Sequence, residues 1–214
     1  PVTAIKASAF VNCGFTSVVV PDSVTSIGAG AFKGCNSLVE ITLPFIGFSE
    51  NTNFPLGYIF GSTNGEGTPK TSENKGYTYQ NTSNEYSNRC YYIPETLRKV
   101  TITKDTTVQA YSFYNCDLIE VVVLPENVSS LGSYAFKNCT SLMSIDGDED
   151  CVLDIPASVT TWEHNVFENC HRIEKVVTNS AMIGGSAFAG CENITAAVLN
   201  SREIGSSAFI NCVN

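Results

Sequence analysis

Apolar side chains recur along this chain in a cycle that repeats every 21 to 23 residues over most of its length. In general form the cycle reads Ile-Gly-x-x-Ala-Phe-x-x-Cys-x-x-Leu-x-x-Ile-x-Leu-Pro, and residues 21–44 contain one complete copy. Residues 56–61 are a shortened copy, LGYIFG, without the cysteine. One unit is too short to bury its own apolar face, so the pattern predicts a solenoid of about eight stacked coils. Seven copies end on a cysteine: Cys13, Cys35, Cys116, Cys139, Cys170, Cys191 and Cys212.

Each cycle contains two short segments with strand character and one with helical character. The Leu-x-x-Ile-x-Leu segment alternates inward and outward positions, as a half-buried strand does. Proline often follows it, as at Pro44 and Pro156, and stops the strand. The Val-x-x-Ile-Gly segment reads as a second strand, whose glycine suits a tight corner or a positive φ. We predict that Ala-Phe-x-x-Cys forms a single helical turn, which places Phe and Cys on one face.

The repeated aromatic and sulfur positions are predicted to be core. We expect the cysteines to be buried free thiols, because parallel Cβ vectors in stacked coils suit a disulfide poorly and no C-x-x-C pair points to a metal. Cys90 and Cys151 lie outside the cycle, and a disulfide between these two is an open alternative. The phenylalanines are expected to stack as one aromatic spine: Phe10, Phe32, Phe113, Phe136, Phe167, Phe188 and Phe209.

Composition narrows the classes of function. Hydrophobic residues make up 43% of the 214 residues, charged residues only 15%, and the net charge is −9. An acidic chain without a basic stripe argues against a nucleic-acid partner and against an anionic membrane surface. No apolar run is long enough to span a bilayer. The chain has no P-loop, dinucleotide fingerprint or nucleophile elbow, and His164 and His171 match no metal-ligand spacing, so we predict no catalytic residue and no cofactor.

A long insertion interrupts the cycle at about residues 61–92. It is rich in Gly, Ser, Asn and Thr, and this composition with tyrosine is typical of binding loops. The alternation at residues 77–79 predicts one strand of a hairpin. Alternatively, the insertion is a tolerated surface loop whose aromatic rings pack back on the coils. Its candidate protein-binding residues are Tyr77, Tyr79, Tyr86, Tyr91 and Tyr92.

A smaller, acidic insertion lies at about residues 146–154. Its aspartates, Asp146, Asp148, Asp150 and Asp154, occupy positions 1, 3, 5 and 9 of a calcium-loop-like pattern. Position 6 is Cys151 rather than glycine, and position 12 is Ala157 rather than glutamate. The segment is therefore either a weak candidate calcium site or a solvated acidic bulge.

In each repeat, the predicted Leu-x-x-Ile-x-Leu strand has an outward position, and these positions together form a second candidate protein-binding surface. A row of Val and Thr is unusually apolar for an exposed face, which indicates a contacted surface. We refer to this row as the ladder, and its members are Val19, Thr42, Thr101, Val123, Val177 and Val198.

The repeated phrase resembles the BspA-type leucine-rich repeat family. The resemblance is carried by IGAGAFKGC at residues 27–35, IGGSAFAGC at 183–191 and IGSSAFINC at 204–212. It implies a right-handed, β-rich leucine-rich-repeat superhelix with no catalytic residues. It also implies a cell-surface or secreted protein that binds host or neighbouring-cell proteins, such as a host extracellular matrix or cell-surface glycoprotein.

We therefore expect residues 1–214 to form one leucine-rich-repeat domain, a fragment that starts and ends in mid-repeat. The expected function is that of a non-catalytic interaction or adhesion module. Two alternatives are open: a structural spacer that presents another domain, and glycan binding through the tyrosine-rich insertion.

Overall fold

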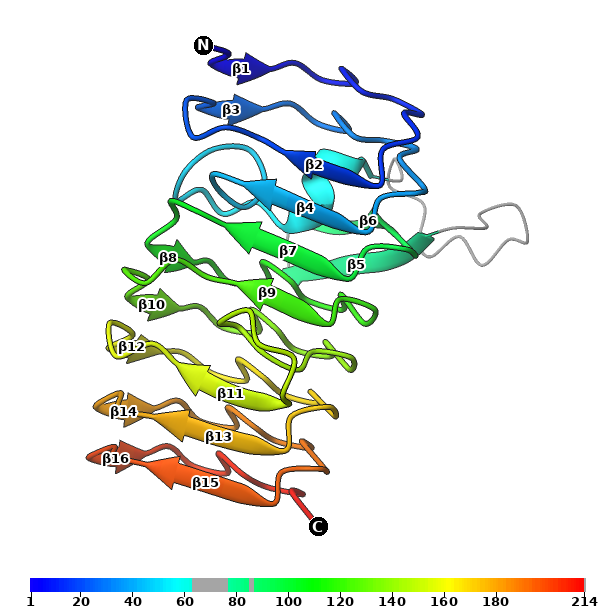
Figure 1. Ribbon diagram of the computed structural model, residues 1–214. Helices are drawn as coiled ribbons and strands as arrows, with labels where there is room; N and C mark the ends of the chain where they lie inside the picture. Colours follow the sequence, from blue (N-terminus) through cyan, green and yellow to red (C-terminus); the bar gives the residue numbers. More distant parts are fainter. Residues whose placement is uncertain (63–76, 85–86, 214) are drawn as a thin grey trace.

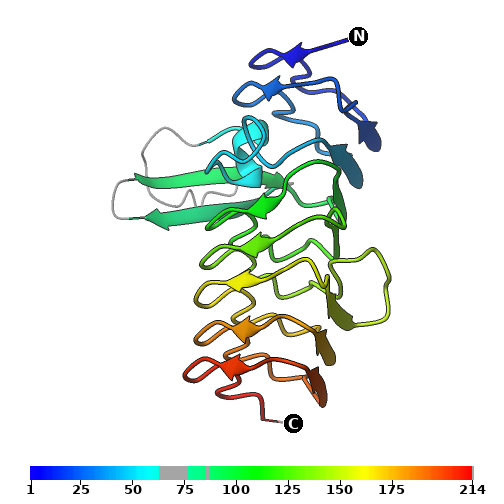
Figure 2. The same cartoon turned by 90° about the vertical axis from the view of Figure 1, so that its left-hand side faces the viewer.

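The computed structural model describes residues 1–62, 77–84 and 87–213, which form a β-solenoid of about eight coils (Figure 1). The predicted fold class is confirmed, while the right-handed sense of the superhelix stays a prediction. A long front sheet and a narrower rear sheet lie on opposite sides of the core (Figure 2).

The front sheet is parallel, and its strands pair in the order β2-β4-β7-β9 and, separately, β11-β13-β15. Each strand comes from the segment that the sequence marks with alternating apolar residues. The strands are β2 (Ser17–Val19), β4 (Glu40–Leu43), β7 (Lys99–Ile102), β9 (Val121–Val123), β11 (Val152–Ile155), β13 (Lys175–Thr178) and β15 (Ala196–Leu199).

The rear sheet consists of two-residue strands, and each strand ends at the Ile position of the Ile-Gly step in its repeat. They pair in parallel as β1-β3, β8-β10-β12 and β14-β16. These strands are β1 (Ala4–Ile5), β3 (Ser26–Ile27), β8 (Thr107–Val108), β10 (Ser130–Leu131), β12 (Thr161–Trp162), β14 (Met182–Ile183) and β16 (Glu203–Ile204).

The predicted helical turns at the Ala-Phe-x-x-Cys segments are wrong. These segments are tight turns, as where the Cys139 amide donates to the Phe136 carbonyl at 3.1 Å. The residues that precede Ala and Cys have left-handed backbone, with φ of 61° at both Tyr134 and Asn138, and such residues end a helix. The one helical segment in the described part of the chain is the 3-10 helix η1 (Leu56–Phe60), in the shortened copy of the repeat.

The glycine of the Ile-Gly step is needed for close approach between coils rather than for a positive φ. A Cβ atom at Gly184 would lie 1.9 Å from the Glu163 carbonyl oxygen of the preceding coil. At Gly28 it would lie 2.3 Å from the Ala7 nitrogen. Neither glycine has left-handed φ, so the tight corner is the correct one of the two alternatives.

The phenylalanines occupy the core, as predicted, but they form two stacks rather than one spine. Phe10, Phe32 and Phe60 form the first stack, in which η1 supplies the ring of the shortened repeat. No ring contact between Phe60 and Phe113 is found among the described residues, so the long insertion coincides with the break. In the second stack neighbouring ring centroids lie 5.0 to 5.5 Å apart, through Phe113, Phe136, Phe167, Phe188 and Phe209.

The repeat cysteines are free thiols that bridge neighbouring coils by hydrogen bonds. The Cys139 thiol donates to the Phe113 carbonyl at 3.0 Å, and the Cys191 thiol donates to the Phe167 carbonyl at 3.0 Å. Burial raises the pKa of the Cys191 thiol to about 12. A thiol that stays protonated is a weak donor and a poor nucleophile, so this position is structural.

The acidic insertion divides the front sheet between β9 and β11. Before it, residues 143–145 run beside β9, as where the Val122 amide donates to the Ser144 carbonyl at 3.2 Å. After it, Cys151 accepts from the Glu174 amide at 2.9 Å and the chain enters β11, which pairs with β13. Residues 143–145 thus pair with β9, the chain then leaves the sheet, and it returns as β11 to pair with β13. The loop between these two segments projects from the sheet in Figure 2.

The segment at residues 45–54, between β4 and η1, is irregular and is held by a buried carboxylate. Asp105, only 3% exposed, accepts hydrogen bonds from the Ile46 amide at 2.7 Å and the Asn51 amide at 2.8 Å. Burial raises the pKa of Asp105 above its ordinary value, although both hydrogen bonds act to lower it. The carboxylate takes the place of the strand pairing that this segment lacks.

We expect Asp105→Asn to lower the free energy of unfolding by about 1–3 kcal/mol at neutral pH, because the amide group cannot accept from both backbone donors. The raised pKa of Asp105 means that its contribution to stability is full below the ordinary aspartate pKa and declines as the pH rises through the folded-state pKa. The wild type should therefore lose stability relative to the variant as the pH rises from the ordinary aspartate pKa toward neutrality. Urea unfolding of both proteins across this range tests this, and a difference that grows with pH would contradict it.

Candidate interaction surface

The ladder predicted from the sequence is present on the outer face of the front sheet. Val19, Thr42, Thr101 and Val123 are register partners across β2, β4, β7 and β9. Val177 and Val198 are register partners across β13 and β15. The side chains are exposed or half-buried, with exposed fractions of 71% for Val19 and 46% for Val198.

Asp154 occupies the ladder position of the divided coil. It is the register partner of Val177 and is exposed. Sequence reasoning placed it only in the acidic insertion and missed its place in the ladder. The signal was available, because Ile155-Pro156 follows Asp154 just as Leu43-Pro44 follows Thr42.

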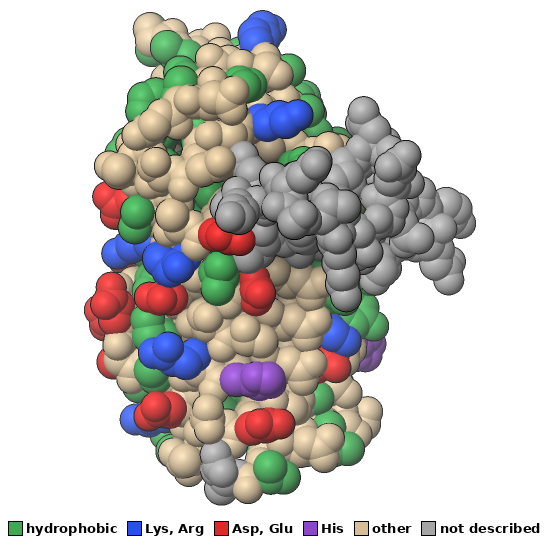
Figure 3. All heavy atoms as spheres, turned by 90° about the vertical axis from the view of Figure 1, so that its right-hand side faces the viewer, with side chains coloured by type: hydrophobic (Ala, Val, Ile, Leu, Met, Phe, Trp, Pro, Cys, Tyr) green, Lys and Arg blue, Asp and Glu red, His purple; other side chains and the backbone are tan. Residues whose placement is uncertain are grey.

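Charges beside the N-terminal half of the ladder compensate one another. Glu40 and Lys99 are register partners on β4 and β7. The Arg98 Nε atom lies 3.5 Å from the Glu120 Oε1 atom. Figure 3 shows basic, acidic and apolar side chains interspersed along the edge of this sheet. An exposed pair of this kind contributes little to stability.

The acidic loop, which we define as residues 146–150, lies against the ladder. Gly147 has a φ of 106°, and a Cβ atom there would lie 3.3 Å from a methyl group of Val123. The Asp148 amide donates to Asp146 Oδ1 at 3.1 Å, and Ser144 Oγ hydrogen-bonds to the Asp148 carbonyl. These bonds give the loop a defined shape beside the sheet.

The four aspartates of the calcium hypothesis do not form a metal-binding group. Among the described residues, which include all of 146–154, no group of three or more His, Cys, Asp or Glu side chains is arranged to hold a metal ion. Asp146 and Asp150 are nevertheless near enough to Asp154 to help raise its pKa, after the larger effect of burial. The arrangement is that of mutually repelling carboxylates at the sheet face.

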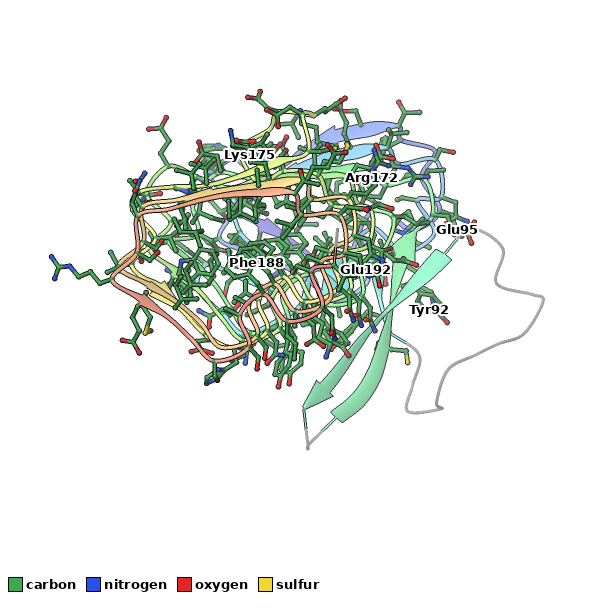
Figure 4. All side chains as sticks on the ribbon, turned by 90° about the horizontal axis from the view of Figure 1, so that it is seen from below. Tyr92, Glu95, Arg172, Lys175, Phe188 and Glu192 are labelled. Atoms are coloured by element: carbon green, nitrogen blue, oxygen red, sulfur yellow. The ribbon has the colours of Figure 1, made fainter. Side chains whose placement is uncertain are left out.

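The long insertion contains the predicted hairpin, formed by antiparallel β5 (Tyr77–Asn84) and β6 (Ser87–Pro94). It projects from the solenoid on the side of the tight turns (Figure 4). Tyr91 is only 6% exposed and Tyr92 packs partly against the core, so neither offers a fully exposed ring. Tyr86 lies outside the described residues, as do the side chains of Tyr77 and Tyr79.

The open alternative of a Cys90–Cys151 disulfide is wrong. Both residues are free cysteines. Cys90 is buried on β6, and Cys151 lies half-buried at the start of β11, where the acidic loop returns to the sheet.

A tyrosine stack on the turn side was missed by the sequence analysis. Tyr111 and Tyr134 occupy equivalent positions in neighbouring coils, and their rings stack at 5.1 Å between centroids. The Lys137 ammonium lies 5.4 Å above the Tyr134 ring and 2.8 Å from Glu168 Oε2. The signal was the recurrence of tyrosine before Ser-Phe and Ala-Phe in two successive repeats.

The family model described as the BspA type leucine-rich repeat region matches this chain in six copies, at residues 3–53 and 84–214. The chain belongs to this family. No curated protein matches it at a significant level. None of the helices in the described part of the chain is long and apolar enough to cross a membrane.

The solved structures that this chain matches include several leucine-rich repeat proteins. The T. pallidum leucine-rich repeat protein is 20% identical with a TM-score of 0.48, and the match covers 99% of this chain and 71% of that protein. A leucine-rich repeat protein from Bacteroides ovatus is 23% identical with a TM-score of 0.45, covering 99% and 39%. A leucine-rich cell surface protein from Faecalibacterium prausnitzii is 18% identical with a TM-score of 0.31, covering 99% and 69%. The BspA-type chain thus spans less than half of the Bacteroides ovatus protein.

Proposed function

We propose that this BspA-type domain is a non-catalytic interaction module that binds a protein partner through the ladder on its front sheet. We further propose that it acts at the cell surface or in secreted form, on a host extracellular matrix or cell-surface glycoprotein. The observation that carries the proposal is the ladder itself, a row of Val and Thr side chains in register on the outer face of a parallel sheet.

The ladder has the physical properties of a contact surface. Its side chains stand on strands that are fixed by parallel pairing, so a partner orders few additional groups on binding. The exposed fraction of Val19 shows that apolar area is available on the face, while the core beneath is already filled by the phenylalanine stacks. Burial of the exposed valines would therefore stabilise a complex without weakening the fold.

The double variant Thr101→Lys/Val177→Lys tests the ladder. We expect it to weaken partner binding about tenfold or more, because two ammonium groups would have to be desolvated at the contact. The matched control is Thr160→Lys/Met182→Lys, at two exposed positions on the rear side. Binding to immobilised extracellular matrix glycoproteins is measured by surface plasmon resonance, with circular dichroism to confirm folding.

The contribution of the insertion is measured in parallel with a variant that lacks residues 63–87. This deletion keeps Cys90 and Tyr91, which are buried against the solenoid, so the coils should remain folded. Loss of binding in this variant alone would place the contact in the hairpin and contradict the ladder proposal. No binding by the parent chain to any matrix glycoprotein or to a glycan array would favour the spacer alternative.

A further inference from the structure

The C-terminal half of the front sheet carries an excess of negative charge that the N-terminal half does not. Asp146, Asp148, Glu149 and Asp150 are all exposed in the acidic loop, and Asp154 is exposed in the ladder beside them. None of these carboxylates takes part in the ion pairs of the described residues, which join Arg98 to Glu120, Lys104 to Glu50 and Lys137 to Glu168.

Few cations balance this group from the neighbouring elements. Lys175 on β13 is the register partner of Val152, and its charge only partly opposes the effects of burial, Asp146 and Asp150, which together raise the pKa of Asp154. Arg172 lies near the start of the loop, where its Nη2 atom contacts the Met143 sulfur at 3.3 Å. Glu174 adds a further exposed carboxylate on the same side. Six carboxylates therefore face two cations across this part of the sheet.

The loop fixes these carboxylates where a bound segment would cross the ladder. Gly147 lies against Val123, so the loop stands between the N-terminal ladder positions and Val177. Asp146 accepts a hydrogen bond from the Asp148 amide, and Asp150 accepts one from the Val152 amide in β11, which holds both carboxylates in place before any partner arrives. Preorganised negative charge of this kind favours a cationic partner and repels an anionic one.

We infer that the front sheet binds an extended, basic protein segment whose Lys or Arg side chains meet the acidic loop and Asp154 while its apolar side chains cover Val177 and Val198. The inference rests on the proposed function and adds the chemical class of the partner. An extended segment places alternate side chains on one face, so its basic side chains can meet the acidic loop and Asp154 while its apolar side chains meet the valines beyond them. Anionic polysaccharides and acidic segments are disfavoured at this surface.

The test uses the whole chain and two labelled peptides, one of alternating Lys and Val and one of alternating Glu and Val. Affinities are measured by fluorescence anisotropy at about 50 mM and about 300 mM NaCl, which differ strongly in screening. We expect binding of the basic peptide only, with an affinity that falls as the salt concentration rises. Binding of the acidic peptide, or of neither peptide, would overturn the inference.

Two variants with equal charge change separate the loop from bulk charge. The loop variant is Asp146→Asn/Asp148→Asn/Glu149→Gln/Asp150→Asn. The control variant is Glu95→Gln/Glu126→Gln/Glu192→Gln/Glu203→Gln, whose carboxylates are exposed and belong neither to the acidic loop nor to the ladder. We expect about tenfold weaker binding in the loop variant and less than about a twofold change in the control. Equal losses in both variants would overturn the inference.

Two further measurements distinguish failure of this inference from failure of the proposed function. The ladder variant Thr101→Lys/Val177→Lys is measured with the same matrix partner as the loop variant. Loss of partner binding in the ladder variant but not in the loop variant would leave the proposed function standing and overturn the basic-partner inference. Peptide binding is also measured with calcium chloride and with EDTA, and a requirement for calcium would overturn the inference by showing that the loop acts as a cation site.

Discussion

Replacement of Phe136 by alanine is expected to lower the free energy of unfolding by about 3–5 kcal/mol. The ring is fully buried, and its centroid lies 5.0 Å from that of Phe113 and 5.1 Å from that of Phe167. Alanine removes contacts with the coils on both sides at once. The space cannot close readily, because parallel pairing of the strands sets the separation between the coils.

The matched control is Phe15→Ala, since Phe15 is 38% exposed and contacts only the edge of the first stack. We expect this variant to lose less than about 1.5 kcal/mol. Urea unfolding followed by circular dichroism gives both values. A central defect in a solenoid also weakens the coupling between its two halves, so the Phe136→Ala transition should broaden. Similar losses for the two variants would show that the stack contributes no more than ordinary burial.

The repeat fixed most of the fold in advance, because each position in the cycle has one physical environment. A phenylalanine that recurs at one position, such as Phe136, can only be core when every coil is stacked on the next. The same reasoning located the ladder, since alternation along a strand assigns Thr42 and Thr101 to the outer face. The binding partner of that face stays a prediction, because the repeat determines where side chains point and not what they bind.

The errors lie where local backbone geometry opposed the pattern. The spacing of Phe and Cys fits a helical turn, but the left-handed backbone at Asn138 and its equivalents gives tight turns instead. Asparagine tolerates this conformation and is common there, so its recurrence before cysteine was an unused signal. The hydrogen bonds from the irregular segment to Asp105 could not be predicted. They join residues more than fifty positions apart, and no recurring residue in the repeat marks them.

The candidate surface was predicted in part for the same reasons. The acidic insertion was recognised by its charge, but its oxygen-rich spacing indicated calcium, and the structure shows the aspartates beside the ladder instead. The hairpin was predicted from alternation at residues 77–79. The burial of Tyr91 agrees with the alternative that the inserted rings pack back on the coils, but the sequence could not decide between the two, because the packing depends on the neighbouring chain at Ser62, with which Tyr91 forms a β-bridge.

A single added methyl group at Gly184 is expected to destabilise the protein by about 3 kcal/mol or more. The Cβ atom of an alanine there would lie 1.9 Å from the Glu163 carbonyl oxygen and 2.8 Å from its carbonyl carbon. Both are backbone atoms of the preceding coil, so no side chain can rotate away. The local backbone is also tied to the coils on either side, since the Glu163 amide donates to Leu131 at 3.0 Å and the Gly205 amide donates to Ile183 at 2.8 Å. The clash can therefore be relieved only if the backbone at Gly184 moves away from the backbone at Glu163, which separates the two coils at this turn.

Gly14→Ala is the matched control, because a Cβ atom there would meet nothing within 4 Å and its φ is not left-handed. Alanine restricts the unfolded chain, so we expect this variant to keep its stability or gain about 0.4–1 kcal/mol. Gly28→Ala provides an intermediate case, since its nearest backbone atom would lie at 2.3 Å rather than 1.9 Å. Urea unfolding should rank the three variants in the order of these distances, with Gly184→Ala the least stable. If Gly184→Ala unfolds at the same urea concentration as Gly14→Ala, the coils can separate at this corner at little cost, and close approach is not the reason that the repeat carries glycine there.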